Sequence, residues 1–187
     1  MPKRSACDED AAAQGSLGHD AGLVEQFLTA CSDPADSARV MAALSDQPEL
    51  ATVAHPANGW TGLHAAATSG RPEIVQTLLS ARADCNARAL DGSSPLHVCA
   101  LHAQRGQQGE VAKLLIQAGC PLETRDASGS TALLRACEAG ADSIAAALLA
   151  ARADPMAANL ANQTCSMLAA QRGHQAISSL LMMFGAR

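Results

Sequence analysis

Apolar residues recur along this chain at a helical spacing, inside units of about 33 residues. In two of these units Ile74 is followed by Leu78, and Ile144 is followed by Leu148. Residues four apart share one face of an α-helix, so each stretch predicts an amphipathic helix. A shorter apolar stretch precedes it in each unit. The pattern therefore predicts a pair of short helices per unit.

The period is read most clearly from turn glycines. Gly59, Gly92 and Gly129 fall in register when the sequence is aligned with itself, and Asn162 takes their place in the last unit. The spacings are 33, 37 and 33 residues, and the longer one reflects an insertion at Ala103 to Gly109. We expect this insertion to lengthen one helical hairpin by about one turn. A fixed period indicates repeats that bury their apolar faces only against their neighbours.

Short polar and small residues predict where the helices begin and end. Thr61, Ser94 and Thr131 precede an apolar stretch, where a hydroxyl can accept a hydrogen bond from an orphan backbone N–H. Gly70 and Gly140 separate the two helices of a unit. Small residues also recur where neighbouring helices have to approach closely, at Ala65, Ala66, Cys99, Ala136 and Ala169.

Together these residues resemble the ankyrin repeat, with Gly-x-Thr-x-Leu-His from Gly59 to His64 followed by Glu73-Ile74-Val75. The resemblance implies an all-α ankyrin-repeat solenoid of stacked antiparallel helix pairs, with projecting hairpin turns and a concave binding face. It covers residues 55–187 in four repeats, which are 55–87, 88–124 with the insertion, 125–157 and 158–187 as a C-terminal cap.

The N-terminal part of the chain lacks this motif. Within residues 20–54, Leu23, Val24, Phe27 and Leu28 form a helical stripe that predicts another helix pair, either a degenerate first repeat or an N-terminal cap. Residues 1–19 are predicted to be a disordered acidic tail. The first 50 residues contain nine acidic and three basic side chains, so this end of the chain is the acidic one.

Two departures from the family pattern are informative. Arg82 and Arg152 stand where the family usually ends its second helix with a left-handed glycine, which costs on the order of 1 kcal/mol each. The last unit carries the apolar run Leu180 to Phe184 in its outer helix, where a cap is expected to be polar. That end of the solenoid is therefore a candidate for docking a partner or another copy.

Composition excludes several classes of protein. The 42 alanines, two phenylalanines and single tryptophan predict a core of small and aliphatic side chains. The net charge of −5 argues against nucleic acid as a partner. The longest apolar runs, such as Ala145 to Ala151, are too short to cross a membrane. Seven cysteines without a CxxC pair favour reduced thiols in the cytoplasm, with the nucleus as a second compartment.

No pattern in the sequence predicts catalysis, a metal or a cofactor. His97 and Cys99 point about 200° apart on one helix, so together with His102 they do not converge on a metal ion. Cys137 and Cys165 have no periodic histidine to activate them. The resemblance instead implies that His64 and His97 hydrogen-bond the turn before their helix. We expect neither enzymatic activity nor a small-molecule substrate.

The predicted function is binding of another protein through the concave face, as an adaptor or assembly factor. The alternative is an inhibitor that covers an enzyme, for example a kinase, or a transcription factor. Variable family positions and their neighbours carried over to this sequence give the candidate contacts Trp60, Asn58, Arg88, Leu90, Asp91, Leu101, His102, Arg125, Glu138 and Arg172.

Trp60 is the leading candidate because it is the only tryptophan, follows a turn glycine, and belongs to a residue type enriched at interface hot spots. The alternative is that its ring folds down to seal the junction with the N-terminal cap. With Leu90, Arg88 and Arg125 it predicts an apolar patch with a basic rim, suited to an acidic or amphipathic segment. Two modification sites are also candidates: Asn86 resembles hydroxylated family asparagines, and Ser5 resembles an acid-directed kinase site.

Overall fold

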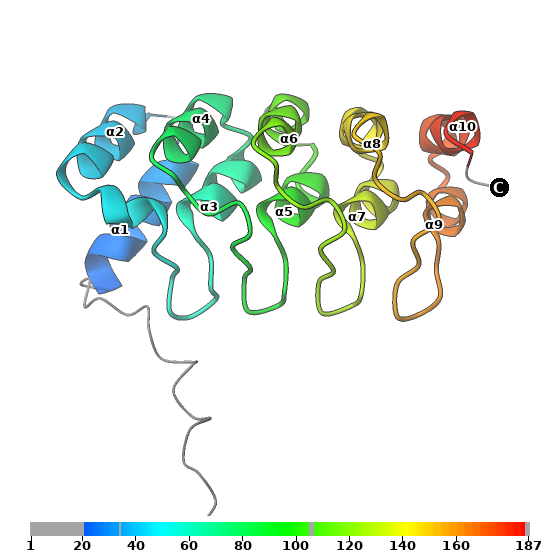
Figure 1. Ribbon diagram of the computed structural model, residues 1–187, viewed down its shortest axis with the longest axis horizontal. Helices are drawn as coiled ribbons and strands as arrows, with labels where there is room; N and C mark the ends of the chain where they lie inside the picture. The colour runs from blue at the N-terminus through cyan, green and yellow to red at the C-terminus, as the bar shows by residue number, and fades with distance from the viewer. Residues whose placement is uncertain (1–20, 34, 105–106, 186–187) are drawn as a thin grey trace, which may run out of the picture.

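The computed structural model describes residues 21–33, 35–104 and 107–185. Within these ranges the chain forms α-helices in two parallel rows, one short 3-10 helix, and a single isolated bridge between Ala158 and Thr164 in place of any strand (Figure 1). The inner row, from which the hairpin turns project, contains α1 (Ala21–Ser32), α3 (Gly62–Ser69), α5 (Pro95–Leu101), α7 (Ala132–Ala139) and α9 (Cys165–Arg172). The outer row contains α2 (Ser37–Asp46), α4 (Pro72–Ser80), α6 (Gln108–Gln117), α8 (Asp142–Ala150) and α10 (Gln175–Met183), with η1 (Pro48–Ala51) after α2.

The two rows confirm the predicted all-α solenoid. Each inner helix packs on the next one along the inner row, from α1 to α9. Each outer helix likewise packs on the next one along the outer row, from α2 to α10. The core lies between the rows. The small residues predicted at the close approaches are all buried, with no more than 2% of their surface exposed: Ala65, Ala66, Cys99, Ala136 and Ala169. Among the described residues, no helix is both long enough and apolar enough to span a membrane.

The helix ends follow the chemistry expected from the sequence. Thr131 Oγ1 accepts a hydrogen bond from the Leu134 N–H at 3.4 Å, which satisfies one orphan donor of α7. Gly140 then ends α7 in the left-handed conformation, with φ 74°. A Cβ at Gly140 would also lie 2.5 Å from the His174 ring, so both the backbone angle and the packing require glycine.

The residues after α4 and α8 carry backbone strain. Arg82 and Arg152 have φ values of 63° and 68°, which confirms that arginine occupies the left-handed position usually given to glycine. We expect Arg82→Gly to raise the free energy of unfolding by about 0.5–1 kcal/mol, measured by urea denaturation. The matched control is Ala81→Gly, because Ala81 has φ −78° and gains nothing from glycine. A loss of stability in Arg82→Gly equal to that in the control would contradict this expectation.

The insertion in the second unit lies in the connection between α5 and α6. The prediction that residues 103–109 add about one helical turn was wrong: α5 has 7 residues, one fewer than α3, and α6 has 10, one more than α4. The Gln107 N–H donates to the Gly70 carbonyl at 3.2 Å, and the buried Gln108 amide donates to the Thr68 carbonyl at 3.3 Å. The extra residues therefore hold the connection against the end of α3.

The N-terminal segment that lacks the repeat motif also forms a helix pair, α1 and α2, followed by η1. Phe27 and Val40 are buried in it, and α1 packs against α3 as one inner helix packs against the next. The predicted tail at residues 1–19, including Ser5, lies outside the described residues.

Candidate protein-binding surface

Four hairpin tips project from the inner row, and each is shaped by a polar side chain that accepts backbone N–H groups (Figure 1). Asn58 Oδ1 accepts the Trp60 N–H at 2.9 Å, and Asp91 Oδ1 accepts the Ser93 N–H at 3.0 Å. In the next two tips, Asp126 Oδ1 accepts the Ser128 N–H and Asn159 Oδ1 accepts the Ala161 N–H. These turns fix the tip conformation before any partner binds.

The tips are also joined to one another by backbone hydrogen bonds. The Leu90 N–H donates to the Asn58 carbonyl at 2.9 Å, and the Ala127 N–H donates to the Asp91 carbonyl at 2.8 Å. The Leu160 N–H continues the series by donating to the Ser128 carbonyl at 3.0 Å. The four tips therefore form one connected edge, whose residues are held at fixed spacing.

Arg88 and Arg125, predicted as a basic rim, bind neighbouring tips of their own chain. Arg88 donates to the Arg125 carbonyl, and Arg125 Nη1 donates to the carbonyls of Gly129 at 2.7 Å and Ala158 at 2.6 Å. Both side chains remain exposed at the surface. The two arginines therefore connect consecutive hairpins. The same hydrogen bonds hold their positive charges in fixed positions along the tips.

His64 connects α3 to the next tip, and His97 does the same for α5. The Thr61 N–H donates to His64 Nδ1 at 3.2 Å, so Nε2 carries the proton and donates to the Ser93 carbonyl at 3.1 Å. His97 repeats this arrangement with Ser94 and with the Ser130 carbonyl. Burial lowers the pKa of both imidazoles below its ordinary value, so the neutral form is favoured. The structural role predicted for both histidines is confirmed.

Two large apolar side chains stand exposed on the tips. Leu90 is 75% exposed and Leu160 is 79% exposed, at equivalent positions of the second and fourth hairpins. Trp60 is half-buried, because its ring stacks on the His64 ring with 6.1 Å between centroids. The tryptophan thus offers less surface to a partner than either leucine does, and the ring that it packs on belongs to the same repeat.

The remaining candidate contacts lie at the other end of the inner helices. Leu101 and His102 lie at the end of α5, Glu138 lies near the end of α7, and Arg172 ends α9. Inner helices of seven or eight residues separate these side chains from the tips by about 10–12 Å. The structure therefore arranges the sequence-derived candidates in two parallel strips, a tip strip and a helix-end strip.

Charged side chains connect the tip of the third repeat to the helix-end strip and the third repeat to the fourth. Arg135 lies 2.6 Å from Asp126 and 3.1 Å from Glu138, and Glu138 lies 3.0 Å from Arg172. Burial alone raises the pKa of Asp126, whose side chain is 3% exposed. Hydrogen bonds from Ser128, Arg135 and Ser130 outweigh that effect and hold this pKa below its ordinary value.

Sequence analysis missed Asp126 and Arg135. The available signal was an acidic residue just before the Ser-Gly-Ser turn, with an arginine on the following helix. Glu138 and Arg172, which were predicted as contacts, are paired with each other in the free protein, and Glu138 is also paired with Arg135.

Cys99 and Cys137 lie in environments that raise the pKa of their thiols. Burial raises the pKa of the Cys99 thiol to about 12, and its Sγ donates to the Gln108 carbonyl. A hydrogen bond with Cys165, together with burial, raises the pKa of the Cys137 thiol further. Nucleophilic attack requires the thiolate, which these environments disfavour at neutral pH. Within the described ranges, no cluster of three or more His, Cys, Asp or Glu side chains is arranged to hold a metal ion.

A row of stacked helix hairpins with connected, pre-shaped tips defines a repeat solenoid built for recognition. The chain belongs to the ankyrin-repeat family, because the family model described as ankyrin repeats (3 copies) matches residues 11–126, 63–159 and 96–187. Ankyrin repeats generally mediate protein–protein interaction, and the family typically supplies interaction modules without enzymatic activity.

Similarity to individual proteins runs through these repeats. Protein phosphatase 1 regulatory subunit 12A of Mus musculus is 35% identical over 83 residues, which is 44% of this chain and 8% of that protein. Ankyrin repeat domain-containing protein 63 of Homo sapiens is 31% identical over 116 residues, covering 61% of this chain and 30% of that protein. Ankyrin repeat and SOCS box protein 16 of Mus musculus is 30% identical over 168 residues, covering 68% of this chain and 37% of that protein. The chain therefore spans well under half the length of these relatives.

Proposed function

We propose that this chain is an adaptor or assembly factor that binds a partner protein along the tip strip and the helix-end strip. The observation that carries the proposal is the connected row of tips, which holds Leu90 and Leu160 in water with most of their surface exposed. Burying two leucines against a partner is favourable, and a surface already fixed by hydrogen bonds loses little entropy when it binds.

The partner that suits this surface is an amphipathic segment with acidic residues. Its apolar side chains would contact Leu90 and Leu160, and its acidic groups would lie near Arg88 and Arg125, which stay exposed although they bind tip carbonyls. Rim charges of this kind mainly increase the rate of association, so the apolar contacts are expected to dominate the affinity.

A second candidate function is inhibition or regulation of an enzyme by covering its working face. The similarity to a protein phosphatase regulatory subunit favours this candidate. The two candidates use the same surface and differ in the partner. Recovery of the partner with the tagged full chain, followed by an activity assay of that partner with and without the chain, distinguishes them.

We expect the double variant Leu90→Ser/Leu160→Ser to weaken binding of the recovered partner by about 2 kcal/mol or more, roughly thirty-fold. Both side chains are exposed, so the helical content and the unfolding midpoint should stay unchanged. Isothermal titration calorimetry measures the effect. Met156→Ser is the matched control, since Met156 is 55% exposed in the loop after α8. Equal affinities of the double variant and the control would remove the tip strip as the binding site.

We further propose that the chain works in the cytoplasm, with the nucleus as a second compartment. Free thiols support this placement: all six cysteines in the described ranges are unpaired. Imaging of the full chain fused to a fluorescent protein tests it, and accumulation in a secretory compartment would contradict it.

A further inference from the structure

The C-terminal end of the solenoid exposes a surface that the preceding repeat buries. Positions in the last two repeats correspond at an interval of 33 residues, as the helix-starting Thr131 and Thr164 show. Leu134 and Leu149 are 0% and 3% exposed, because the next helix pair covers them. At the equivalent positions Met167 is 58% exposed and Met182 is 77% exposed. The face of α9 and α10 is therefore a stacking surface without its neighbour.

This end is apolar beyond those two positions. Met183 is 80% exposed and Phe184 is 46% exposed, whereas Leu181 from the same run is buried in the core. The expectation that the whole run Leu180 to Phe184 is available for docking therefore holds only for its last three residues, since Leu180 is half-buried. Ser166 occupies the position equivalent to the buried Leu133. The surface is thus apolar with a polar part, as in interfaces that form and dissociate.

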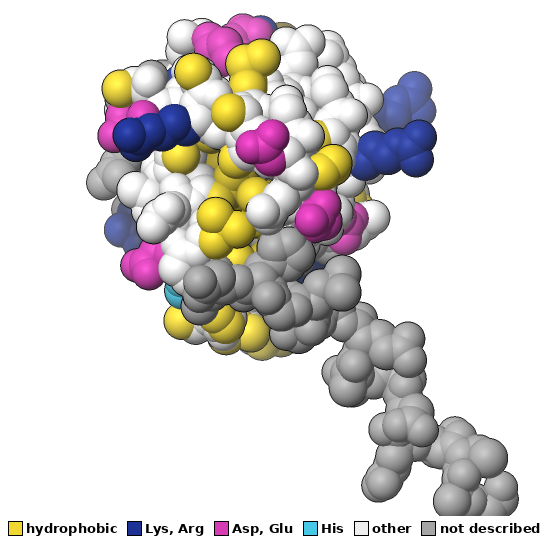
Figure 2. All heavy atoms as spheres, turned by 90° about the vertical axis from the view of Figure 1, so that its left-hand side faces the viewer, with side chains coloured by type: hydrophobic (Ala, Val, Ile, Leu, Met, Phe, Trp, Pro, Cys, Tyr) yellow, Lys and Arg dark blue, Asp and Glu magenta, His cyan; other side chains and the backbone are white. Residues whose placement is uncertain are grey.

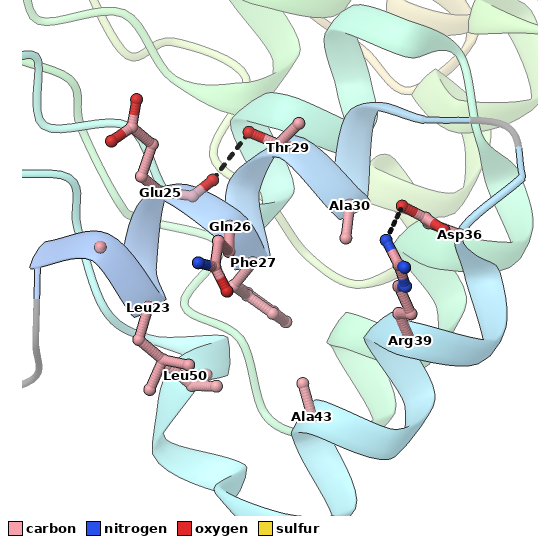
Figure 3. A pocket seen from close by; sticks show the side chains of 11 residues that line it. Leu23, Glu25, Gln26, Phe27, Thr29, Ala30, Asp36, Arg39, Ala43 and Leu50 are labelled. Carbon is pink, nitrogen blue, oxygen red and sulfur yellow. Dashed lines mark hydrogen bonds and ion pairs between the residues drawn. The ribbon is translucent and has the colours of Figure 1, made fainter.

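The opposite end of the solenoid is hollow. Between α1, α2 and η1 lies a groove of about 640 Å³, toward which Leu23, Phe27, Ala43 and Leu50 point (Figure 3). Figure 2 shows the molecule from this end, with hydrophobic side chains gathered between charged ones. The floor of the groove is apolar, with Phe27 and Leu50 buried in it, and Glu25, Gln26 and Arg39 make other parts of its lining polar. The groove has room for one or two methionine side chains.

The two ends of the solenoid differ in charge. The described charged side chains of the α1 to η1 segment are Glu25, Asp33, Asp36, Arg39, Asp46 and Glu49, five acidic and one basic. On α9 and α10 the charged side chain is Arg172, which is paired with Glu138 of the preceding repeat, so this end is close to neutral. Two acidic ends repel each other, whereas an acidic end and a nearly neutral end do not, so contact between the N-terminal end and the C-terminal end is favoured over contact between two N-terminal ends.

We propose that the C-terminal face of one molecule docks into the N-terminal groove of a second copy of this chain. Met167 and Met182, the two side chains on the uncovered stacking face, pack against the groove lined by Leu23, Phe27 and Leu50. The stack of helix pairs then continues from one copy to the next. The contact joins two different surfaces, so each copy keeps one free end and can add another copy. The tip strip takes no part in this contact, so the self-association stands or falls separately from partner binding.

Sedimentation velocity of the full chain over roughly 1 µM to 1 mM tests the proposal. We expect the weight-average mass to rise with concentration. Met182→Glu removes the C-terminal surface, and Gly22→Glu places a carboxylate at the groove, where a Cβ meets nothing within 4 Å. Each variant alone should weaken the association at least tenfold. Met156→Glu, an exposed methionine away from both ends, is the matched control and should behave as the unaltered chain.

Mixing the two variants gives the decisive result. The Met182→Glu chain keeps an intact groove and the Gly22→Glu chain keeps an intact C-terminal face, so an equimolar mixture should form dimers and nothing larger. A monomer at every concentration of the unaltered chain would overturn the proposal and leave the surface to a different protein. Undiminished association of Gly22→Glu alone would also overturn it, because it would indicate that two C-terminal faces pair with each other.

Discussion

Acidification from about pH 7 to about pH 5 is expected to lower the free energy of unfolding of this chain steeply. His64 and His97 are buried, and burial lowers the pKa of each imidazole in the folded chain. In the unfolded chain both titrate near the ordinary value of about 6.5, so below that pH the unfolded state binds more protons than the folded state.

The sign and size of the effect follow from proton binding. The contribution of each neutral histidine is fully present above about pH 6.5 and is lost as the pH falls below it. The loss approaches about 1.4 kcal/mol per pH unit for each histidine, until the folded pKa is reached. Urea denaturation at several pH values between about 5 and 7.5 measures the slope.

The chain itself provides the matched control for this prediction. Leu134 occupies the same position in the third repeat and is fully buried, so leucine is compatible with the site. His97→Leu removes the hydrogen bond to the Ser130 carbonyl, which should cost about 1–3 kcal/mol at pH 7.5. The substitution should also reduce the slope of the free energy of unfolding against pH by the contribution of one histidine. A slope identical to that of the unaltered chain would show that His97 does not carry the effect.

Arg135→Met is expected to lower the free energy of unfolding by about 2–3 kcal/mol. The substitution leaves the Asp126 carboxylate buried, with the Ser128 and Ser130 donors on Oδ1 but without the guanidinium on Oδ2. Removing one partner of a buried pair leaves a charge that neither water nor protein solvates well. Thermal and urea unfolding at pH 7 measure the loss.

A surface ion pair within the same chain serves as the comparison. Lys113 and Glu110 lie 2.8 Å apart with more than half of each side chain exposed. Lys113→Met should therefore change stability by at most about 0.5 kcal/mol. Equal losses in Arg135→Met and Lys113→Met would mean that burial of Asp126 does not set the strength of its ion pair.

The fold was predictable because its information is local and repeated. Thr61 and Thr131 start helices, Gly140 ends one, and Leu78 and Leu148 mark buried faces, all within a single unit of sequence. Recurrence of these residues at the same spacing in successive units distinguishes them from a chance match. The backbone strain at Arg82 was also predictable, because the neighbouring units show that this position adopts a left-handed conformation.

The candidate site was less predictable because it depends on contacts between units. The sequence marks Arg88 and Arg125 as basic but does not show that their N–H groups bind the carbonyls of the next tip. It likewise places Trp60 on a tip without showing that the ring stacks on His64. The pairing of Asp126 with Arg135 joins a turn to a helix, so no periodic pattern in the sequence predicts it.

The position of the four-residue insertion has a practical consequence. The added length is absorbed between α5 and α6, while the Ala127 N–H still reaches the Asp91 carbonyl across the neighbouring tips. Length variation on that side of the molecule thus leaves the distance between Leu90 and Leu160 untouched.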